Sequence, residues 1–221
     1  IMVAISVAML AQSLDLREIV DGQNDYIYVF VQPLGLVLFF IAGLAEVGRT
    51  PFDIYFAESE IVGGPFVEYS GAHWSVFFLA EYINTFAIAA LMVILFLGGW
   101  SGPVLSGNWE IIWFLGKVYV VIMVIFWVRG TFPRLRIDQL MAFAWKVMVP
   151  MSFLSVVMTA VYQFYDWPAW SLTAMSSAGL AVVGLLIFKK MTAPSKLVAE
   201  VKARREALEA QRRPAASGGG D

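Results

Sequence analysis

Residues 74–97 read WSVFFLAEYINTFAIAALMVILFL and contain a single charged side chain, that of Glu81. A helix that crosses the hydrocarbon core of a bilayer needs about 20 apolar residues, so this stretch predicts a membrane-spanning helix. The run is too long for a membrane β-strand, and it lacks the alternation of apolar and polar residues that such strands show. The sequence around it is therefore expected to fold as an all-α membrane protein.

The composition of the 221 residues agrees with this expectation. The chain is 60% hydrophobic and 14% charged, with a mean hydropathy of +0.74, whereas soluble domains carry about 25% charged residues. The absence of Cys and the formal net charge of −2 exclude a disulfide scaffold and give no basic field for nucleic acid. We predict an integral membrane protein.

A polytopic helix bundle is predicted for residues 1–190, followed by a charged tail at 191–221. Pro33 and Pro150 fall inside expected spans, where each would bend the helix axis. The chain starts at Ile1 within an apolar run and without a basic leader, so we interpret it as the later part of a longer chain. The six expected spans cover residues 1–14 (cut short), 26–45, 74–97, 109–128, 145–162 and 170–188.

The basic residues predict which connections face the cytoplasm. Thirteen of the fifteen Lys and Arg residues lie in or beside the connections 46–73 and 129–146 and in the tail. Because basic residues gather in cytoplasmic loops, we expect these three segments on the cytoplasmic side of the cell membrane. The tail from Pro194 to Arg213 is either a helix lying on the membrane or on a partner, or a solvated segment that fixes topology.

The connection 46–73 is unusually acidic and is interleaved with apolar residues, which argues against an ordinary solvated loop. Its acids continue into the following span at Glu81, and ionisable residues inside membranes are by default functional, commonly in proton relays. The alternative is a structural glutamate that is neutral or paired. Glu46 and Arg49 are three residues apart and are expected to pair on one helix face. The predicted proton relay consists of Glu46, Glu58, Glu60, Glu68 and Glu81.

Further charges stand in the later spans. Lys117 is an intramembrane cation, which either neutralises a carboxylate on a neighbouring helix or extends to an interface. A basic cluster follows the span that holds it, and there Arg134 and Asp138 have the i,i+4 spacing of an ion pair. We expect this cluster to dock a partner or an anionic lipid, through Arg129, Arg134, Arg136 and Asp138.

With no Cys and one His, the chain is not expected to hold a metal ion or an iron–sulfur cluster. It also lacks a dinucleotide-binding fingerprint, and we expect it to bind no flavin. Redox chemistry would have to come from a diffusible molecule or from another subunit.

Five motifs carry a family resemblance. They read AEVGRTPFDIYFAESEIVGG (45–64), EYSG (68–71), FFLAEYIN (77–84), LFLGGW (95–100) and WVRGTFPRLRIDQLM (127–141). In order and spacing they resemble the H subunit of bacterial respiratory complex I, an NADH:quinone oxidoreductase. Members of that family have eight or nine transmembrane helices, so the resemblance implies that the spans here are the last six of nine.

The resemblance implies a quinone as substrate, with iron–sulfur and other membrane-arm subunits as partners. Family members form much of the quinone cavity, and a line of carboxylates couples quinone reduction to proton pumping. The five glutamates of the predicted relay fall on family acids. The residues implied at the quinone cavity are Arg49, Phe52, Asp53, Phe56, Glu58 and Glu60.

This sequence departs from the family pattern at four positions. Tyr55 and Phe56 replace a proline and a carboxylate, and Val47-Gly48 replaces a polar pair. The loss of an acid at Phe56 could reflect a different quinone or electron donor. Two alternatives therefore stay open, namely a membrane anchor in a hydrogenase-like complex that binds no quinone and, less favoured, a free-standing ion transporter.

Overall fold

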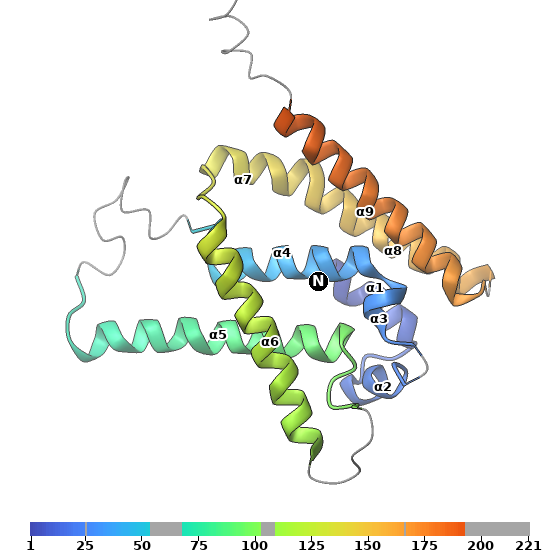
Figure 1. Ribbon diagram of the computed structural model, residues 1–221, viewed down its shortest axis with the longest axis horizontal. Coiled ribbons are helices and arrows are strands. Elements are labelled where there is room, and N and C mark those ends of the chain that lie inside the picture. The colour runs from blue at the N-terminus through green and yellow to red at the C-terminus, as the bar shows by residue number, and fades with distance from the viewer. Residues whose placement is uncertain (25, 54–67, 103–108, 166, 193–221) are drawn as a thin grey trace, which may run out of the picture. The chain divides into compact units, whose positions relative to one another are not determined.

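A computed structural model of the protein describes residues 1–24, 26–53, 68–102, 109–165 and 167–192, which form helices and no strand (Figure 1). This confirms the all-α prediction for the described part of the chain. The helices are α1 (Met2–Ala11), α2 (Leu16–Asp21), α3 (Tyr28–Val31), α4 (Pro33–Val47), α5 (Ala72–Phe96), α6 (Trp109–Thr131), α7 (Ile137–Phe143), a π-helix (Ala144–Met148), α8 (Val149–Tyr165) and α9 (Ala169–Thr192).

Three helical stretches within the described residues are long and apolar enough to cross a membrane. They are α5, α6 and the continuous stretch Ile137–Tyr165, which joins α7, the π-helix and α8. The apolar helices α1 and α4 are shorter, with 10 and 15 residues. The protein is therefore a multi-pass membrane protein, whereas the prediction of six spans is not confirmed.

The predicted span 26–45 is interrupted between α3 and α4. Gln32 has φ −133° and ψ 63°, and Pro33 is the first residue of α4. Proline disfavours the helical conformation in the residue before it and donates no backbone hydrogen bond. The expected bend at Pro33 is therefore a complete break of the helix at Gln32.

The predicted basic connection 129–146 is shorter in the structure, because helix begins at Ile137. The π-helix directly precedes α8, whose second residue is Pro150. A π turn widens the helix locally and can accommodate a proline ring in the following turn. The span predicted to start at Trp145 thus starts earlier and stays helical through Pro150.

The chain divides into two compact units, residues 1–180 and 181–221. In the first unit α1 packs against α8 and α4, and α5 packs against α4 and α6 (Figure 1). The buried core includes Val7, Leu34, Leu38, Val93, Phe96 and Val118. The approach of α4 to α5 is close, since a Cβ added at Gly43 would lie 2.7 Å from Ile88 Cγ2.

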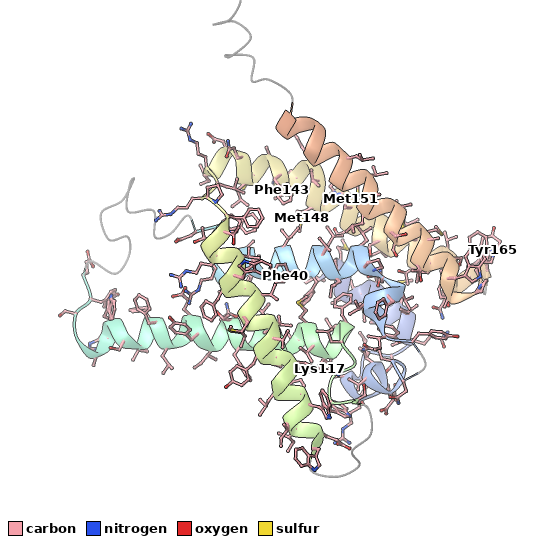
Figure 2. All side chains as sticks on the ribbon, viewed as in Figure 1. Phe40, Lys117, Phe143, Met148, Met151 and Tyr165 are labelled. Atoms are coloured by element: carbon pink, nitrogen blue, oxygen red, sulfur yellow. The ribbon has the colours of Figure 1, made fainter. Side chains whose placement is uncertain are left out.

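Large apolar side chains cover the outside of the first unit, as the stick view shows (Figure 2). Phe77, Ile83, Ile112, Met123 and Trp127 on α5 and α6 are among the exposed ones. Exposed apolar surface of this extent is typical of a protein surrounded by lipid or neighbouring subunits. The predicted tail, 191–221, lies almost entirely outside the described residues, and its boundary stays a prediction.

Candidate functional site

The turn after α4 carries the motif residues into position. α4 ends at Val47, and Gly48 takes the left-handed conformation with φ 68° and ψ 26°. Gly48 N–H donates to Ala45 O, and Arg49 N–H donates to Leu44 O, both at 3.3 Å. These two bonds form a Schellman motif, which favours glycine at the left-handed position. Gly48, one of the positions at which this sequence differs from the family pattern, thus ends α4. Arg49 therefore lies outside the helix.

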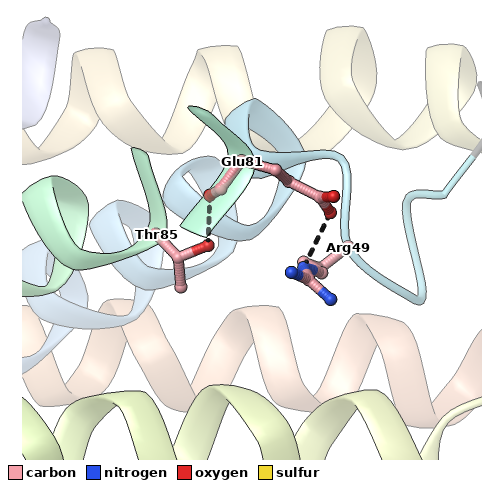
Figure 3. Close-up of polar contacts among 3 residues, drawn as sticks. All are labelled: Arg49, Glu81 and Thr85. Carbon is pink, nitrogen blue, oxygen red and sulfur yellow. Dashed lines mark hydrogen bonds and ion pairs between the residues drawn. The ribbon is translucent and has the colours of Figure 1, made fainter. Parts of the chain in front are cut away.

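Arg49 and Glu81 form an ion pair between this turn and α5 (Figure 3). Arg49 Nε lies 2.9 Å from Glu81 Oε1, and the two side chains are 7% and 17% exposed. The backbone carbonyl of Glu81 accepts a hydrogen bond of 2.8 Å from Thr85 Oγ1, one turn further along α5. A pair so far removed from solvent cannot lose one partner cheaply, because the other would remain as an uncompensated charge.

The Arg49 guanidinium is also held by aromatic rings. Its Cζ atom lies 5.0 Å from the centre of the Tyr82 ring and 6.0 Å from that of Phe126. Its contact with Glu81 does not have hydrogen-bond geometry, and among the described residues Nη2 finds no hydrogen-bond acceptor. Arg49 therefore keeps donor capacity that a second acidic or carbonyl group can use.

The expected partner of Arg49 was Glu46, and that prediction is wrong. The i,i+3 rule holds on a continuous helix, whereas the turn at Gly48 separates the two residues. Glu46 is instead exposed and lines a groove of about 430 Å³ together with Leu38 and Ser152. The alternative interpretation of Glu81 was a structural glutamate that is neutral or paired. The structure gives Glu81 such a partner in Arg49.

The remaining acids of the predicted relay are not gathered around this pair in the described part of the chain. Glu68 is exposed just ahead of α5. Phe56, Glu58 and Glu60 lie outside the described residues. Of the five predicted relay glutamates, the structure thus places Glu81 beside Arg49 and leaves Glu46 and Glu68 at the surface of this chain.

The structure brings the acidic and basic motifs together through their backbones. Leu135 N–H donates a hydrogen bond of 3.0 Å to Pro51 O, and Phe52 N–H donates one of 2.9 Å to Arg49 O. Phe52 is buried with the core, and Asp53 is half-buried. These bonds hold residues 49–53, which read RTPFD and are called the RTPFD turn below, against the segment between α6 and α7.

The basic cluster is exposed, as docking residues would be. Arg129, Arg134, Arg136 and Asp138 all face away from the core. The expected ion pair between Arg134 and Asp138 is absent from the described contacts. Arg134 precedes α7, which has Arg136 as its N-cap, so the helical i,i+4 spacing does not apply to it.

Lys117 binds backbone carbonyls. Its ammonium donates to Leu97 O at 2.8 Å, Gly99 O at 3.1 Å and Ser101 O at 2.6 Å. Figure 2 shows it on α6 beside the loop that follows α5. The carbonyls at a helix C-terminus lack intrahelical donors and carry partial negative charge. The cation thus binds the C-cap carbonyl of α5 and two carbonyls of the following loop. Among the described contacts it meets no carboxylate, and its extension to an interface stays a prediction.

Sequence reasoning missed two buried glutamines. Gln23, 1% exposed, donates to Ile94 O at 2.9 Å and accepts from Gly98 N–H at 2.8 Å, which adds a second cap to α5. Gln32, also 1% exposed, contacts hydroxyls of α1 and α8. The signal for Gln32 was present, because an amide beside a proline within an apolar run needs buried partners.

These features define a multi-pass helical membrane protein that carries a buried ion pair more than two turns into a helix long enough to span the membrane. A family model described as NADH dehydrogenase matches residues 1–160. The chain belongs to this family, and its relatives are named as the H subunit of NADH-quinone oxidoreductase.

Three of these relatives indicate how much of the family the chain covers. The one from Geobacillus kaustophilus is 52% identical over 73% of this chain and 49% of its own length. The one from Geobacter sulfurreducens is 48% identical over 71% and 45%, and the one from Dehalococcoides mccartyi is 44% identical over 83% and 51%. The chain spans about half the length of these curated relatives.

Proposed function

We propose that the protein is a membrane subunit of a complex I-type NADH:quinone oxidoreductase, in which it forms part of the quinone cavity and couples quinone reduction to proton translocation. The observation that carries this proposal is the Arg49–Glu81 pair. It joins the motif that resembles the family's quinone-site loop to a helix long enough to cross the membrane.

The quinone would be reduced near the RTPFD turn by electrons from an iron–sulfur cluster in a partner subunit. Arg49 supports this assignment, because its Nη2 has no acceptor among the described residues and a quinone carbonyl is an acceptor of the required kind. Phe52, Asp53, Phe56, Glu58 and Glu60 complete the proposed cavity.

Coupling would act through charge. The electrons that reduce the quinone would place negative charge near Glu58 and Glu60, and this charge would attract the Arg49 guanidinium until protons taken up by the quinone neutralise it. Any movement of Arg49 towards that charge would weaken its pair with Glu81. Protons would then pass by way of Glu46, Glu68 and Glu81 along the membrane domain.

The topology of the family supports the remaining assignments. We assign six spans to this chain, the last six of nine. Three are the long helical stretches described above, and the other three are α1, α3 together with α4, and α9. The motif 45–64, the basic cluster and the tail face the cytoplasm in this arrangement. Arg129, Arg134, Arg136 and Asp138 would dock a partner subunit of the peripheral or membrane arm.

A hydrogenase-like membrane anchor without quinone is the alternative. The names of the relatives favour a quinone-linked complex over such an anchor. The two functions make different predictions for ligand binding, so one labelling experiment separates them.

That experiment uses a photoreactive quinone analogue on the assembled complex that contains this protein. We expect labelled peptides from residues 46–70, competed by unlabelled quinone and weakened in the Arg49→Lys variant. Glu110→Gln, an exposed change at the start of α6, serves as control and should label as wild type. Labelling that avoids residues 46–70 would overturn the quinone assignment and favour the anchor.

A further inference from the structure

The break between α3 and α4 holds a cluster of polar side chains inside the apolar bundle. Gln32 Nε2 lies 3.0 Å from Ser6 Oγ, 2.8 Å from Ser155 Oγ and 3.1 Å from Thr159 Oγ1. All four residues are at most 1% exposed. The cluster joins α1, the break itself and α8 inside the first unit.

The hydroxyl protons of the cluster are already engaged. Ser6 Oγ donates to Val3 O at 2.7 Å, and Thr159 Oγ1 donates to Ser155 O at 2.9 Å. Ser155 Oγ donates to Ser6 Oγ at 3.4 Å. The hydroxyl oxygens therefore act as acceptors for the Gln32 amide, and none of the hydroxyl protons is directed at the Gln32 carbonyl.

Gln32 Oε1 is consequently a buried acceptor that finds no hydrogen-bond donor among the described residues. A buried amide carbonyl without a donor costs stability, and such groups in folded proteins commonly bind internal water. The neighbouring residue on that side is a glycine, and a Cβ added at Gly35 would lie 3.4 Å from Oε1. Gln32 Oε1 is itself buried, and the absence of a side chain at Gly35 leaves only backbone on this side of the amide.

The cluster also stands between two cavities. A groove of about 430 Å³ on one side is lined by Glu46 and Ser152, and a second one of about 290 Å³ is lined by Tyr28 and Tyr162. In α8 the polar residues Ser152, Ser155, Thr159 and Tyr162 follow one another at intervals of three and four residues, which places them along one face. These four residues lie in the part of α8 between Met151 and Tyr165, two residues that Figure 2 labels.

We propose that Gln32, Ser6, Ser155 and Thr159 form a buried water-binding site, and that this site joins the Glu46 groove to the Tyr28–Tyr162 cavity as a path for protons. Water bound here donates one hydrogen bond to Gln32 Oε1. The bound water takes up a proton from one end and releases a different proton to the other, so the water, the hydroxyls and the amide keep their composition. The water site stands on the geometry of the cluster, whereas its use for protons rests on the proposed function.

The water site is tested by an electron cryo-microscopy map of the assembled complex at a resolution that shows ordered water. We expect a water peak at about 2.7–3.2 Å from Gln32 Oε1, retained in the Ser176→Ala variant and lost or displaced in Gln32→Leu. A protein donor or an apolar side chain against Oε1 would overturn the site. This readout does not depend on enzymatic activity.

The proton path is tested in proteoliposomes with the conservative variants Ser155→Ala and Thr159→Val. Each removes one hydroxyl from the site, and we expect the number of protons pumped per electron to fall while quinone reduction continues. Ser176→Ala is the matched control, because Ser176 is a buried hydroxyl that donates to the backbone carbonyls of Val31 and Thr173. It should pump as wild type.

The outcomes separate the two proposals. Wild-type pumping by Ser155→Ala and Thr159→Val, together with loss of pumping by Glu81→Gln, would overturn this path and leave the proposed function standing. Wild-type pumping by Glu81→Gln, with the water peak in place, would overturn the relay role of Glu81 and leave the water site standing.

Discussion

At the scale of single residues, Arg49 and Glu81 show how a turn decides a charge pair. Arg49 follows Glu46 by three residues, and one continuous helix would have paired them. Gly48 ends α4 instead, and the guanidinium reaches Glu81 on the next helix at 2.9 Å. Sequence spacing could not predict this contact, because it depends on the conformation of a glycine and on how two helices pack.

The pair predicts a non-additive effect on stability. Arg49→Met leaves the Glu81 carboxylate without its counterion, a change that costs about 3–5 kcal/mol in buried pairs. Glu81→Gln leaves the Arg49 guanidinium as the uncompensated charge and should also destabilise the protein, but by less, because the amide oxygen and the rings of Tyr82 and Phe126 still attract the cation. The double variant should be more stable than the sum of the single losses predicts, as measured by the half-inactivation temperature of the detergent-solubilised complex. Strict additivity of the two changes would mean that the side chains do not interact.

Lys117 predicts a structural defect of another kind. Lys117→Met keeps the apolar stem but removes the donors for the carbonyls of Leu97, Gly99 and Ser101. An unsatisfied carbonyl costs about 1–3 kcal/mol when it is fully buried and less when it is part-buried, as these are, so we expect a lower half-inactivation temperature and less assembled complex.

Lys146→Met is the control for this change, because Lys146 is exposed. It should assemble and inactivate as wild type. A Lys117→Met complex as stable as wild type would show that the carbonyls do not need the ammonium.

At the scale of elements, the α4–α5 contact positions the ion pair. The helices approach closely at Gly43, where an added Cβ would meet Ile88 Cγ2 at 2.7 Å. Small residues allow such approaches between membrane helices. The separation of α4 from α5 in turn sets the reach between Arg49 and Glu81.

Gly43→Ala should therefore destabilise the protein by about 1–3 kcal/mol through overpacking. Gly116→Ala in α6 is the matched control, because a Cβ there meets nothing within 4 Å. It should be neutral or stabilising by up to about 1 kcal/mol, since alanine favours helix. Ile88→Leu lacks the Cγ2 atom and should partly restore Gly43→Ala. Equal half-inactivation temperatures for the two glycine variants would contradict the close packing.

Element prediction succeeded where hydropathy alone decides. The spans predicted at 74–97 and 109–128 correspond closely to α5 and α6. It was less successful near the two prolines, because the sequence predicted a bend at each. The helix continues through Pro150 after a π-helix, whereas it is broken at Gln32, directly before Pro33. The sequence shows where a proline lies. It does not show whether neighbouring helices provide hydrogen-bond partners for the backbone groups around that proline.

At the scale of the whole molecule, the sequence predicted an all-helical membrane protein, and it predicted the family through five motifs between residues 45 and 141. It did not predict which acids meet, since contacts between residues distant in sequence depend on packing. The Gln32 cluster shows the same limit, because its members lie up to 127 residues from Gln32 along the chain. Polar residues buried in an apolar bundle can be recognised in a sequence, but their partners cannot.

The proposed coupling depends on whether Glu81 exchanges a proton when the quinone is reduced. The most direct measurement is the number of protons pumped per electron by the Glu81→Gln complex in proteoliposomes, with Glu110→Gln as control. We predict that the ratio falls in Glu81→Gln while quinone reduction continues, and that Glu110→Gln keeps the wild-type ratio. An unchanged ratio in Glu81→Gln would contradict the role of Glu81 and leave its pair with Arg49 as a purely structural contact.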